Sequence, residues 1–336
     1  MRIPRSNRLK RGLWSAGVME PRLVILSRGP ELYSTKRMFE EAEAAGWSVQ
    51  ILDPLKLTTV VDDNGVKVFN KGWPVDCDAV IPRIGNSITG KGVPIVKAFE
   101  RMGVIVLNEG GGISSSRDKL MACQMMNERG IPVPITANVG TWQDTRRAIS
   151  RVGGTPCVVK VTEGTHGSGV FLAHTEQQAR QLVYQMLERD MRPLVQEYIK
   201  ESHGQDVRAF VVGGKVVAAM RRKARGGEFR SNFHLGAKVE KLEIPDKHSE
   251  IACKAAETMG LDIAGVDLLE SSRGALVLEV NSSPGLEGIE AASGVNVASK
   301  IIQHLNRVWE KKVGQGDSSE APSDQEVNGE GTSDAY

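Results

Sequence analysis

The stretch G-V-D-L-L-E-S-S-R-G-A-L-V-L-E-V-N spans residues 265–281 and decides the fold of this 336-residue chain. Its two apolar-rich arms, Gly265–Glu270 and Ala275–Asn281, have the composition of paired strands and predict a β-hairpin. The connection S-R-G (272–274) predicts a three-residue turn with glycine in the left-handed third position. Such a turn pairs Ser271 with Ala275, and this pairing sets the register of the whole hairpin.

That register gives the hairpin a polar face. Asp267 lies directly opposite Glu279, and Asn281 shares the face because it is two residues further along an extended strand. Carboxylate and amide oxygens are hard ligands that suit magnesium or manganese shared with substrate phosphates. The flanking apolar residues are expected to face a core, namely Val266, Leu268, Leu278 and Val280. The three polar residues predict a metal site, and solvated positions on an edge strand are the alternative.

Strands and helices alternate before this hairpin. The expected strands are Leu23–Leu26, Val49–Leu52, Asp78–Pro82 and Val104–Leu107, and the expected helices are Lys36–Ala45 and Val93–Met102. Alternation of this kind predicts a mostly parallel sheet with helices on both faces. We therefore expect an N-terminal parallel α/β domain over residues 20–115.

A second α/β region follows over residues 116–312. Its expected elements are helix Arg117–Arg129 after cap-capable Ser114–Ser116, strands Cys157–Val161 and Val170–Ala173, helix Thr175–Asp190 and strand Leu194–Ile199. A hairpin of Val207–Val212 and Lys215–Met220 around Gly213-Gly214, helix Ser249–Met259, the opening hairpin and helix Ala298–Lys311 complete it. We expect a smaller lobe over residues 131–200 and a larger lobe over residues 201–312.

Both ends differ from the folded part in composition. Residues 1–19 are basic and residues 313–336 are rich in glycine, serine and acids, so both are expected to be disordered. A functional basic arm at the first end is the alternative. The net charge of +2 requires no nucleic-acid partner, and no apolar run is long enough for a membrane span. Four scattered cysteines favour neither a disulfide framework nor a zinc site, so we expect a cytoplasmic protein.

A glycine-rich turn, E-G-T-H-G-S-G (163–169), joins two of the expected strands. It is no Walker A motif, because no Lys-Ser/Thr pair follows its last glycine. Its backbone N–H groups could cover phosphate oxygens as a flap, and a plain hairpin loop is the alternative. Lys160 could reach a phosphate from the strand end or be an ordinary surface lysine. The basic run over residues 221–230 could attract phosphates or an acidic substrate, or be a solvated loop.

In order and spacing, these residues resemble the ATP-grasp superfamily, and within it the RimK-type ribosomal-protein L-glutamate ligases. The matching stretches are L-S-R-G-P-E-L-Y-S-T-K-R (26–37), A-V-I-P-R-I-G (79–85), R-D-K (117–119), V-V-K-V-T-E-G-T-H-G-S-G-V (158–170), V-Q-E-Y-I-K-E (195–201), D-V-R (206–208), F-R-S-N-F-H (229–234), A-G-V-D (264–267) and L-E-V-N-S-S-P-G-L-E-G-I-E (278–290). The resemblance implies an ATP-grasp fold with an N-terminal pre-ATP-grasp domain.

The resemblance also implies roles for individual residues. Lys160, Lys119 and the turn containing Gly167 would contact the ATP phosphates. The linker at Glu197 and Tyr198 would meet adenine, largely through backbone groups. Four further residues and one loop would complete the site. Asp206 would lie near the ribose, and Arg230, Ser231 and Asn232 would lie at the nucleotide and acyl phosphate, with Arg230 and Asn232 catalytic. The loop Ser283–Gly285 would lie at the acceptor. Asp267 and Glu279 would hold one ion, and Glu279 and Asn281 a second.

The implied activity is ATP-dependent addition of L-glutamate to the C-terminal tail of a small-subunit ribosomal protein through an acyl phosphate. Chain elongation to oligo-α-glutamate is part of this expectation, as are two Mg²⁺ or Mn²⁺ ions and a homotetramer. No direct binding of nucleic acid and no membrane attachment are expected. The alternatives are a ligase for another amino acid or acceptor, such as a carrier protein, peptide or cofactor, and a non-catalytic ATP-binding regulator.

Overall fold

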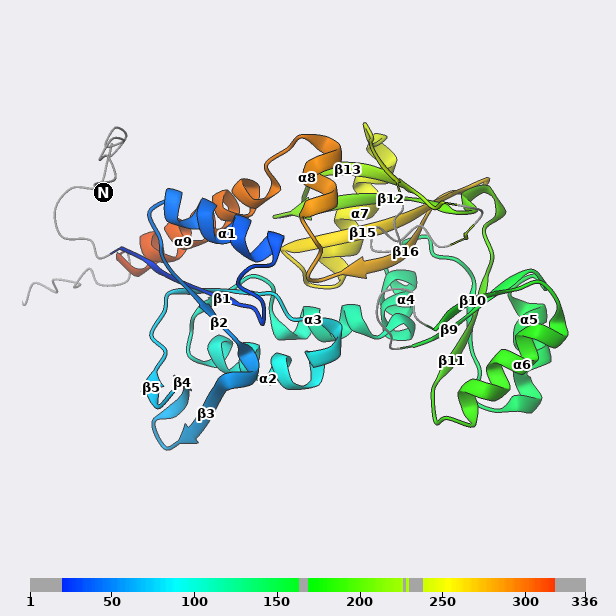
Figure 1. Ribbon diagram of the computed structural model, residues 1–336, viewed down its shortest axis with the longest axis horizontal. Helices are drawn as coiled ribbons and strands as arrows, with labels where there is room; N and C mark the ends of the chain where they lie inside the picture. Colours follow the sequence, from blue (N-terminus) through cyan, green and yellow to red (C-terminus); the bar gives the residue numbers. More distant parts are fainter. Residues whose placement is uncertain (1–19, 163–168, 226–227, 230–237, 318–336) are drawn as a thin grey trace, which may run out of the picture.

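Four sheets build the described part of the molecule: two of four strands, one of five and one of three. The computed structural model describes residues 20–162, 169–225, 228–229 and 238–317. Figure 1 shows a small sheet with two helices at one end of the molecule, the largest sheet beside it, and the N-terminal sheet at the other end. The predicted disordered segments 1–19 and most of 313–336 lie outside the described residues.

The N-terminal sheet has the strand order β2-β1-β6-β7, and all its pairs are parallel. Its strands are β1 (Arg22–Leu26), β2 (Ser48–Leu52), β6 (Ala79–Pro82) and β7 (Ile105–Val106), with helices α1 (Tyr33–Ala44) and α2 (Thr89–Arg101) on opposite faces. The predicted parallel α/β arrangement is confirmed. A three-stranded antiparallel sheet of β3 (Leu57–Asp62), β4 (Gly65–Asn70) and β5 (Trp73–Pro74) was not predicted.

The predicted helix Arg117–Arg129 is confirmed as α4 (Lys119–Glu128), and Arg117 ends a separate helix that was not predicted, α3 (Gly110–Arg117). The break occurs at Asp118, whose backbone is extended and whose carboxylate accepts hydrogen bonds from the N–H groups of the first turn of α4. The cap is therefore Asp118 and not the predicted Ser114–Ser116, which lie inside α3. Gly112 lets α3 approach the turn after helix α7 (Asp246–Thr258), because a Cβ there would lie 2.6 Å from the Gly260 carbonyl oxygen.

The small sheet has the order β10-β9-β11-β8 and carries helices α5 and α6. Its elements are β8 (Thr136–Asn138), α5 (Thr145–Arg151), β9 (Cys157–Val161), β10 (Val170–Ala173), α6 (Glu176–Leu187) and β11 (Pro193–Glu197). Thr175 and Gln178 form the predicted capping box at the start of α6. Strand β8 and helix α5 were not predicted.

The large sheet is antiparallel, with the order β14-β13-β12-β15-β16. Its strands are β12 (Gln205–Val212), β13 (Lys215–Lys223), β14 (Lys238–Lys241), β15 (Ile263–Ser271) and β16 (Gly274–Asn281). Gly213 and Gly214 have φ values of 55° and 73°, as the predicted primed turn between β12 and β13 requires. Helix α7 covers the apolar face formed by Val207, Ala209, Val266 and their neighbours.

The C-terminal helices join the large sheet to the N-terminal domain. Helices α8 (Glu287–Ser293) and α9 (Val297–Asp317) share one core with α1 and β1, and this core includes Phe210 of the large sheet. Trp47 stacks edge-on against Trp309 of α9 at 5.7 Å between ring centroids. Helix α9 runs six residues beyond the predicted end at Lys311. Within the described ranges, no helix is both long and apolar enough to cross a membrane.

The hairpin of β15 and β16 has the predicted polar face, but its turn and its register differ from the prediction. Ser271 pairs with Gly274 and not with Ala275, so the turn has two residues and is one residue shorter than predicted. A β-bulge between Asp267 and Leu268 then shifts the register by one, which sets Asp267 opposite Glu279 as predicted. Because of the bulge, Val277 and not the predicted Leu278 faces the core. Val277 is fully buried and Leu278 is half-buried.

Candidate active site

The charged residues of the large sheet lie in one row across neighbouring strands. Arg208 of β12 pairs with Asp267 of β15, which in turn pairs with Glu279 of β16. Asp206 is two residues before Arg208 and pairs with Arg222 of β13, so it shares their face. The same face becomes apolar at Phe210, where it enters the core shared with α1 and α9. The site therefore lies where this sheet face leaves the core.

Two arginines hold the Asp267 carboxylate. The Arg208 guanidinium donates to both of its oxygens at 2.7 Å, and the Nη2 of Arg222 lies 2.9 Å from Oδ2. Arg222 also donates to both oxygens of Asp206, at 2.6 and 2.5 Å. Asp206, Asp267 and Arg222 are each at most 5% exposed, so this is a buried ion-pair network.

The network keeps Asp267 ionised. Burial alone would raise the pKa of Asp267, but Arg208 and Arg222 outweigh burial and lower it. Burial likewise acts to lower the pKa of Arg222, and attraction to Asp267 and Asp206 raises it instead. The carboxylate of Asp206, predicted to lie near the ribose, is thus committed to Arg222 in this state of the protein.

The three predicted metal ligands lie on adjoining strands. The Asn281 amide nitrogen is 3.4 Å from Asp267 Oδ2 and 3.3 Å from the Gly265 carbonyl oxygen. In the described part of the chain, no three His, Cys, Asp or Glu side chains are placed together as for a metal. The predicted donor set is two carboxylates and one amide, and it stays a prediction. These oxygen donors fit a hard divalent cation. Asp267 and Asn281 are in contact, and Glu279 is their ladder neighbour.

The predicted phosphate-binding lysines lie close to each other. Lys160 ends β9 with 4% exposure, and its amine donates to the Gln196 side chain at 3.0 Å. Burial lowers its pKa to about 8, and the charge of Lys119 lowers it as well, whereas Cys123 and Glu279 raise it. Lys119 is the first residue of α4, and its N–H donates to the carbonyl of Thr162 at the end of β9. A buried lysine without a carboxylate partner suits an anionic ligand.

The predicted adenine linker is tied to the hairpin turn. The Glu197 carboxylate accepts hydrogen bonds from the Ile135 N–H at 3.1 Å and from Arg273 at 2.5 Å. Tyr198 contacts His203 through its hydroxyl. These contacts occupy the Glu197 side chain, and the predicted contact of the linker with adenine stays a prediction.

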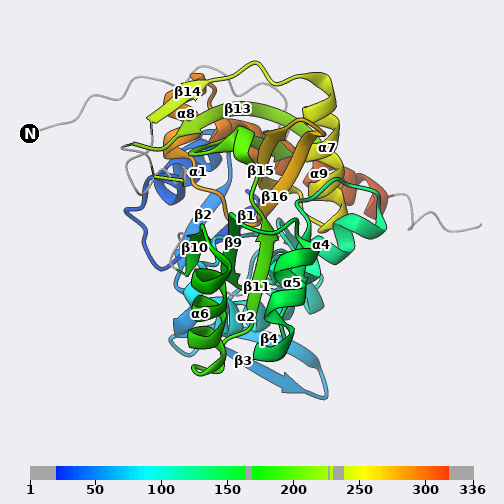
Figure 2. The ribbon, with the colours of Figure 1, turned by 90° about the vertical axis from the view of Figure 1, so that its right-hand side faces the viewer.

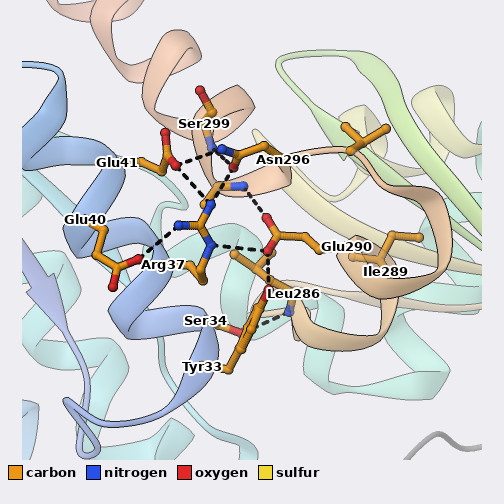
Figure 3. Close-up of polar contacts among 12 residues, drawn as sticks. Tyr33, Ser34, Arg37, Glu40, Glu41, Leu286, Ile289, Glu290, Asn296 and Ser299 are labelled. Carbon is orange, nitrogen blue, oxygen red and sulfur yellow. Dashed lines mark hydrogen bonds and ion pairs between the residues drawn. The ribbon is translucent and has the colours of Figure 1, made fainter.

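The loop after β16 is held from the N-terminal domain. The Arg83 guanidinium donates to the Pro284 carbonyl at 2.7 Å, and Ser34 accepts from the Leu286 N–H at 2.9 Å. Figure 3 shows that Arg37 and Tyr33 of α1 point at Glu290 of α8, next to this loop. The predicted acceptor loop Ser283–Gly285 is therefore fixed by α1 and by the residue after β6.

Some predicted residues cannot be placed. Gly167, Arg230, Ser231 and Asn232 lie outside the described residues, as does most of the predicted flap. Sequence reasoning gave no role to Arg208 and Arg222 as partners of the acids, or to Arg83 and Arg117. For Arg208 and Arg222, the available signal was the alternation of Asp206 with Arg208 along one strand. Arg83 and Arg117 carried no such signal, because their neighbours come from distant segments.

Solved structures share this fold. The ATP-grasp ligase PsnB complexed with minimal precursor superposes with a TM-score of 0.67 and 20% identity, covering 86% of this chain and 99% of that chain. The RimK domain protein ATP-grasp of Sphaerobacter thermophilus gives 0.65 and 20%, covering 84% and 98%. At these identities the likeness concerns the fold alone. The fold is ATP-grasp, preceded by the parallel domain described above.

Sequence comparison identifies the family. The RimK-like ATP-grasp domain family matches residues 116–305, and the RimK PreATP-grasp domain family matches residues 22–113. A probable alpha-L-glutamate ligase of Aeromonas salmonicida is 48% identical over 285 residues, covering 84% of this chain and 96% of the relative. One from Legionella pneumophila strain Corby is 48% identical over 288 residues, covering 85% and 95%. The chain belongs to the RimK-like ATP-grasp family and is an ATP-dependent carboxylate–amine ligase.

Proposed function

We propose that this protein adds L-glutamate to the C-terminal carboxylate of a small-subunit ribosomal protein and can extend the product to oligo-α-glutamate. The observation that carries this is the set of cations around Glu279. Lys160 and Arg117 both interact electrostatically with Glu279, and no ion pair within the described ranges joins either cation to a carboxylate. Such a site suits ATP together with carboxylate substrates. The names of the curated relatives support glutamate as the amino acid.

The chemistry follows from the charge of a carboxylate, which repels an incoming amine. Transfer of the γ-phosphoryl group to a carboxylate oxygen breaks the bond to the β-phosphate oxygen and releases ADP. The amine nitrogen of glutamate then attacks the acyl carbon, the carbon–oxygen bond to phosphate breaks, and the amine loses a proton. The products are an amide and inorganic phosphate. Positioning and fixed charge supply most of the acceleration, and no side-chain nucleophile is needed.

The chain's own residues divide this work. Lys160 and Lys119 hold the phosphates of ATP from the end of β9 and the start of α4. Asp267 and Glu279 would hold one magnesium or manganese ion, and Glu279 with Asn281 a second. A bound divalent ion would neutralise charge on the transferring phosphoryl group. Arg208 and Arg222 keep the Asp267 carboxylate ionised and fixed in orientation. Arg230 and Asn232 would assist at the acyl phosphate, with Gly167 in the flap and Ser231 at the nucleotide.

The remaining expectations belong to the same proposal. The division at residues 115 and 116, the two lobes, a cytoplasmic location and a homotetramer fit the proposed ligase. A second candidate keeps the chemistry and changes the acceptor to another peptide. It is favoured by the likeness to PsnB, whose structures are described as complexed with a precursor peptide.

One assay tests both candidates. The full chain is incubated with ATP, Mg²⁺, labelled L-glutamate and either small-subunit ribosomal proteins or a panel of unrelated peptides. We expect label at the C-terminus of one ribosomal protein, located by mass spectrometry, with one ADP released per residue added. Label only in unrelated peptides would replace the first candidate by the second. ADP release with another amino acid and none with glutamate would contradict the proposed amino acid.

A further inference from the structure

Arg83 and Arg117 are two arginines without an acidic partner. Arg83 follows β6 and donates through Nη2 to the Pro284 carbonyl at 2.7 Å, and Arg117 ends α3 and donates through Nη2 to the Ile84 carbonyl at 2.7 Å. Neither forms an ion pair with any carboxylate in the described part of the chain. The Nε of Arg117 is buried and has no hydrogen-bond partner there. Two guanidinium groups therefore keep donors that the chain itself does not use.

The two charges repel each other. Burial and, to a smaller extent, the neighbouring charge of Arg117 together lower the pKa of Arg83 to about 10. Burial also lowers the pKa of Arg117, and attraction to Glu279 offsets part of this effect. Holding two like charges in a partly buried place costs free energy unless an anion lies between them. Glu279 is near enough to attract Arg117, but no carboxylate of the described residues forms an ion pair with either arginine.

The pair lies where open α/β sheets bind ligands. Strand β1 is followed by β2 on one side and has β6 on the other, with α1 and α2 on opposite faces. The strand order thus reverses between β1 and β6, and ligands bind beyond the carboxyl ends of strands at such a point. Arg83 is the first residue after β6 at that edge.

The pair also adjoins the site of amide formation. Arg83 contacts the loop after β16, and Arg117 interacts with Glu279, a predicted metal ligand. The hydroxyls of Ser282 and Ser283 in that loop are buried without a hydrogen-bond partner in the described part. The unsatisfied Arg117 Nε beside this loop and the unsatisfied serine hydroxyls within it indicate that a polar ligand completes this region.

We propose that Arg83 and Arg117 bind a carboxylate of the incoming amino acid and so place its amine beside the activated acyl group. This rests on the proposed amino-acid ligase activity and names how its second substrate is held. A guanidinium fork matches a carboxylate in plane and spacing, and a pair of forks is suited to select an acidic amino acid. In the proposed ligase the nucleotide phosphates are bound by Lys160 and Lys119, which leaves these two arginines for the amino acid.

The test measures binding directly. L-Glutamate is titrated calorimetrically into the full chain in the presence of a non-hydrolysable ATP analogue and Mg²⁺, and the same is done with L-glutamine and with L-isoglutamine. In Arg117→Met and Arg83→Met, affinity for L-glutamate falls about 10- to 100-fold, since a charged hydrogen-bonded pair is lost. Affinity for the ATP analogue stays unchanged. Arg117→Lys, which keeps the charge and loses the fork, lies in between.

The amides separate recognition from a merely structural role. Of L-glutamine and L-isoglutamine, the one whose amide group replaces the bound carboxylate binds the wild type weakly. The methionine variants bind this amide as well as they bind L-glutamate. Arg28→Met is the matched control, because Arg28 is an exposed arginine at the same sheet edge, bonded to Ser87 at 3.4 Å. It leaves the affinity for L-glutamate unchanged.

Three results overturn the proposal: no binding of glutamate to the wild type, wild-type affinity in both methionine variants, or an equal loss for glutamate and both amides. A variant counts as folded when it binds the ATP analogue normally. A positive binding result with no incorporation into ribosomal proteins contradicts the proposed acceptor and leaves this inference intact.

Discussion

Two groups of arginines differ in their partners. On the large sheet, Arg208 and Arg222 are saturated by Asp206 and Asp267 through short, mostly bidentate hydrogen bonds. At the edge of the N-terminal sheet, Arg83 and Arg117 donate only to backbone carbonyls within the described residues. Both groups lie next to Glu279 or its ladder neighbour Asp267.

The difference separates support from recognition. A buried charge with its counter-charge is a fixed structural part, and removing one partner exposes the other to a large desolvation cost. A buried charge without a counter-charge is unfavourable by itself and becomes favourable when a ligand brings the missing charge. We therefore expect substitutions in the first group to change stability, and substitutions in the second group to change substrate affinity.

The largest expected effect comes from breaking the paired group. Arg222→Met should lower the free energy of unfolding by about 3–5 kcal/mol, because Asp206 and Asp267 lose their shared cation. Urea unfolding at pH 7 measures this. Lys223→Met is the control, because Lys223 forms an exposed pair with Glu240 at 2.8 Å and should cost under about 1 kcal/mol. Equal losses of unfolding free energy in Arg222→Met and Lys223→Met would contradict the role of the buried ion-pair network.

The pH dependence of the free energy of unfolding tests the paired group in a second way. The folded-state pKa of Asp267 is lowered from 3.8, so its stabilising contribution is complete above that pH and is lost as the pH falls through the folded-state value. In Arg222→Met this pKa should rise, and the deficit against wild type should shrink in acid. A deficit that is constant from pH 7 to pH 3 would argue against this assignment.

Glu279 lies between the two groups and tests the metal assignment. Glu279→Gln should lower kcat by roughly 10²–10³-fold, equivalent to about 3–4 kcal/mol, because a neutral amide cannot replace a carboxylate on a divalent ion. Turnover at saturating ATP and Mg²⁺ is the measurement. Glu270→Gln in the same hairpin, where Glu270 pairs with Arg221, should keep its activity. Wild-type turnover of Glu279→Gln would remove Glu279 from the metal site.

Lys160 is a third buried cation that forms no ion pair with an acid among the described residues. Its pKa of about 8 in the free protein means that ATP binding should weaken above pH 8, by up to about tenfold per pH unit, because only the ammonium form binds phosphate. The dissociation constant of ATP measured between pH 7 and pH 10 shows this. In Lys160→Arg the guanidinium stays charged, so the dependence should disappear. An unchanged pH dependence of ATP binding in Lys160→Arg would assign that dependence to another titratable group.

The smallest effect is expected at the contact between α1 and α8. Glu290→Gln weakens the bonds to Tyr33 and Arg37 and should cost about 1 kcal/mol of unfolding free energy. The hydrogen bond to Glu290, together with burial, raises the pKa of Tyr33, so this pKa should fall toward 10.0 in the variant. Ultraviolet titration against Tyr33→Phe isolates the signal. An unshifted Tyr33 would show that Glu290 does not hold it.

The hairpin shows how far local patterns predict the structure. The alternation of residues and the glycine correctly predicted a hairpin with Asp267 opposite Glu279. The predicted turn was one residue too long, and the bulge at Leu278 compensated for the difference. A bulge has no signature in composition, because it depends on which side chains the core of α7 accepts. Val277 occupies the core position that Leu278 was expected to fill.

Asp118 gives a second example. The run from Arg117 to Arg129 has helical composition throughout, and nothing in it requires a break. The break arises because α3 packs at Gly112 against the turn after α7, while α4 starts from the end of β9 through the Lys119 N–H. Two helices with different anchors cannot be collinear. The Asp118 carboxylate then caps the second helix.

By itself the sequence predicted most of the main strands and helices, the polar face of the hairpin and, through the resemblance, the family. These depend on periodicity and short spacings, which are properties of neighbouring residues. Only the tertiary structure decided which charges are paired. Arg222 meets Asp267 from 45 residues away, and Arg117 approaches Glu279 from 162 residues away. Because the energy of a buried charge depends on its surroundings, the same residue type supports the fold at Arg222 and, as we propose, binds substrate at Arg117.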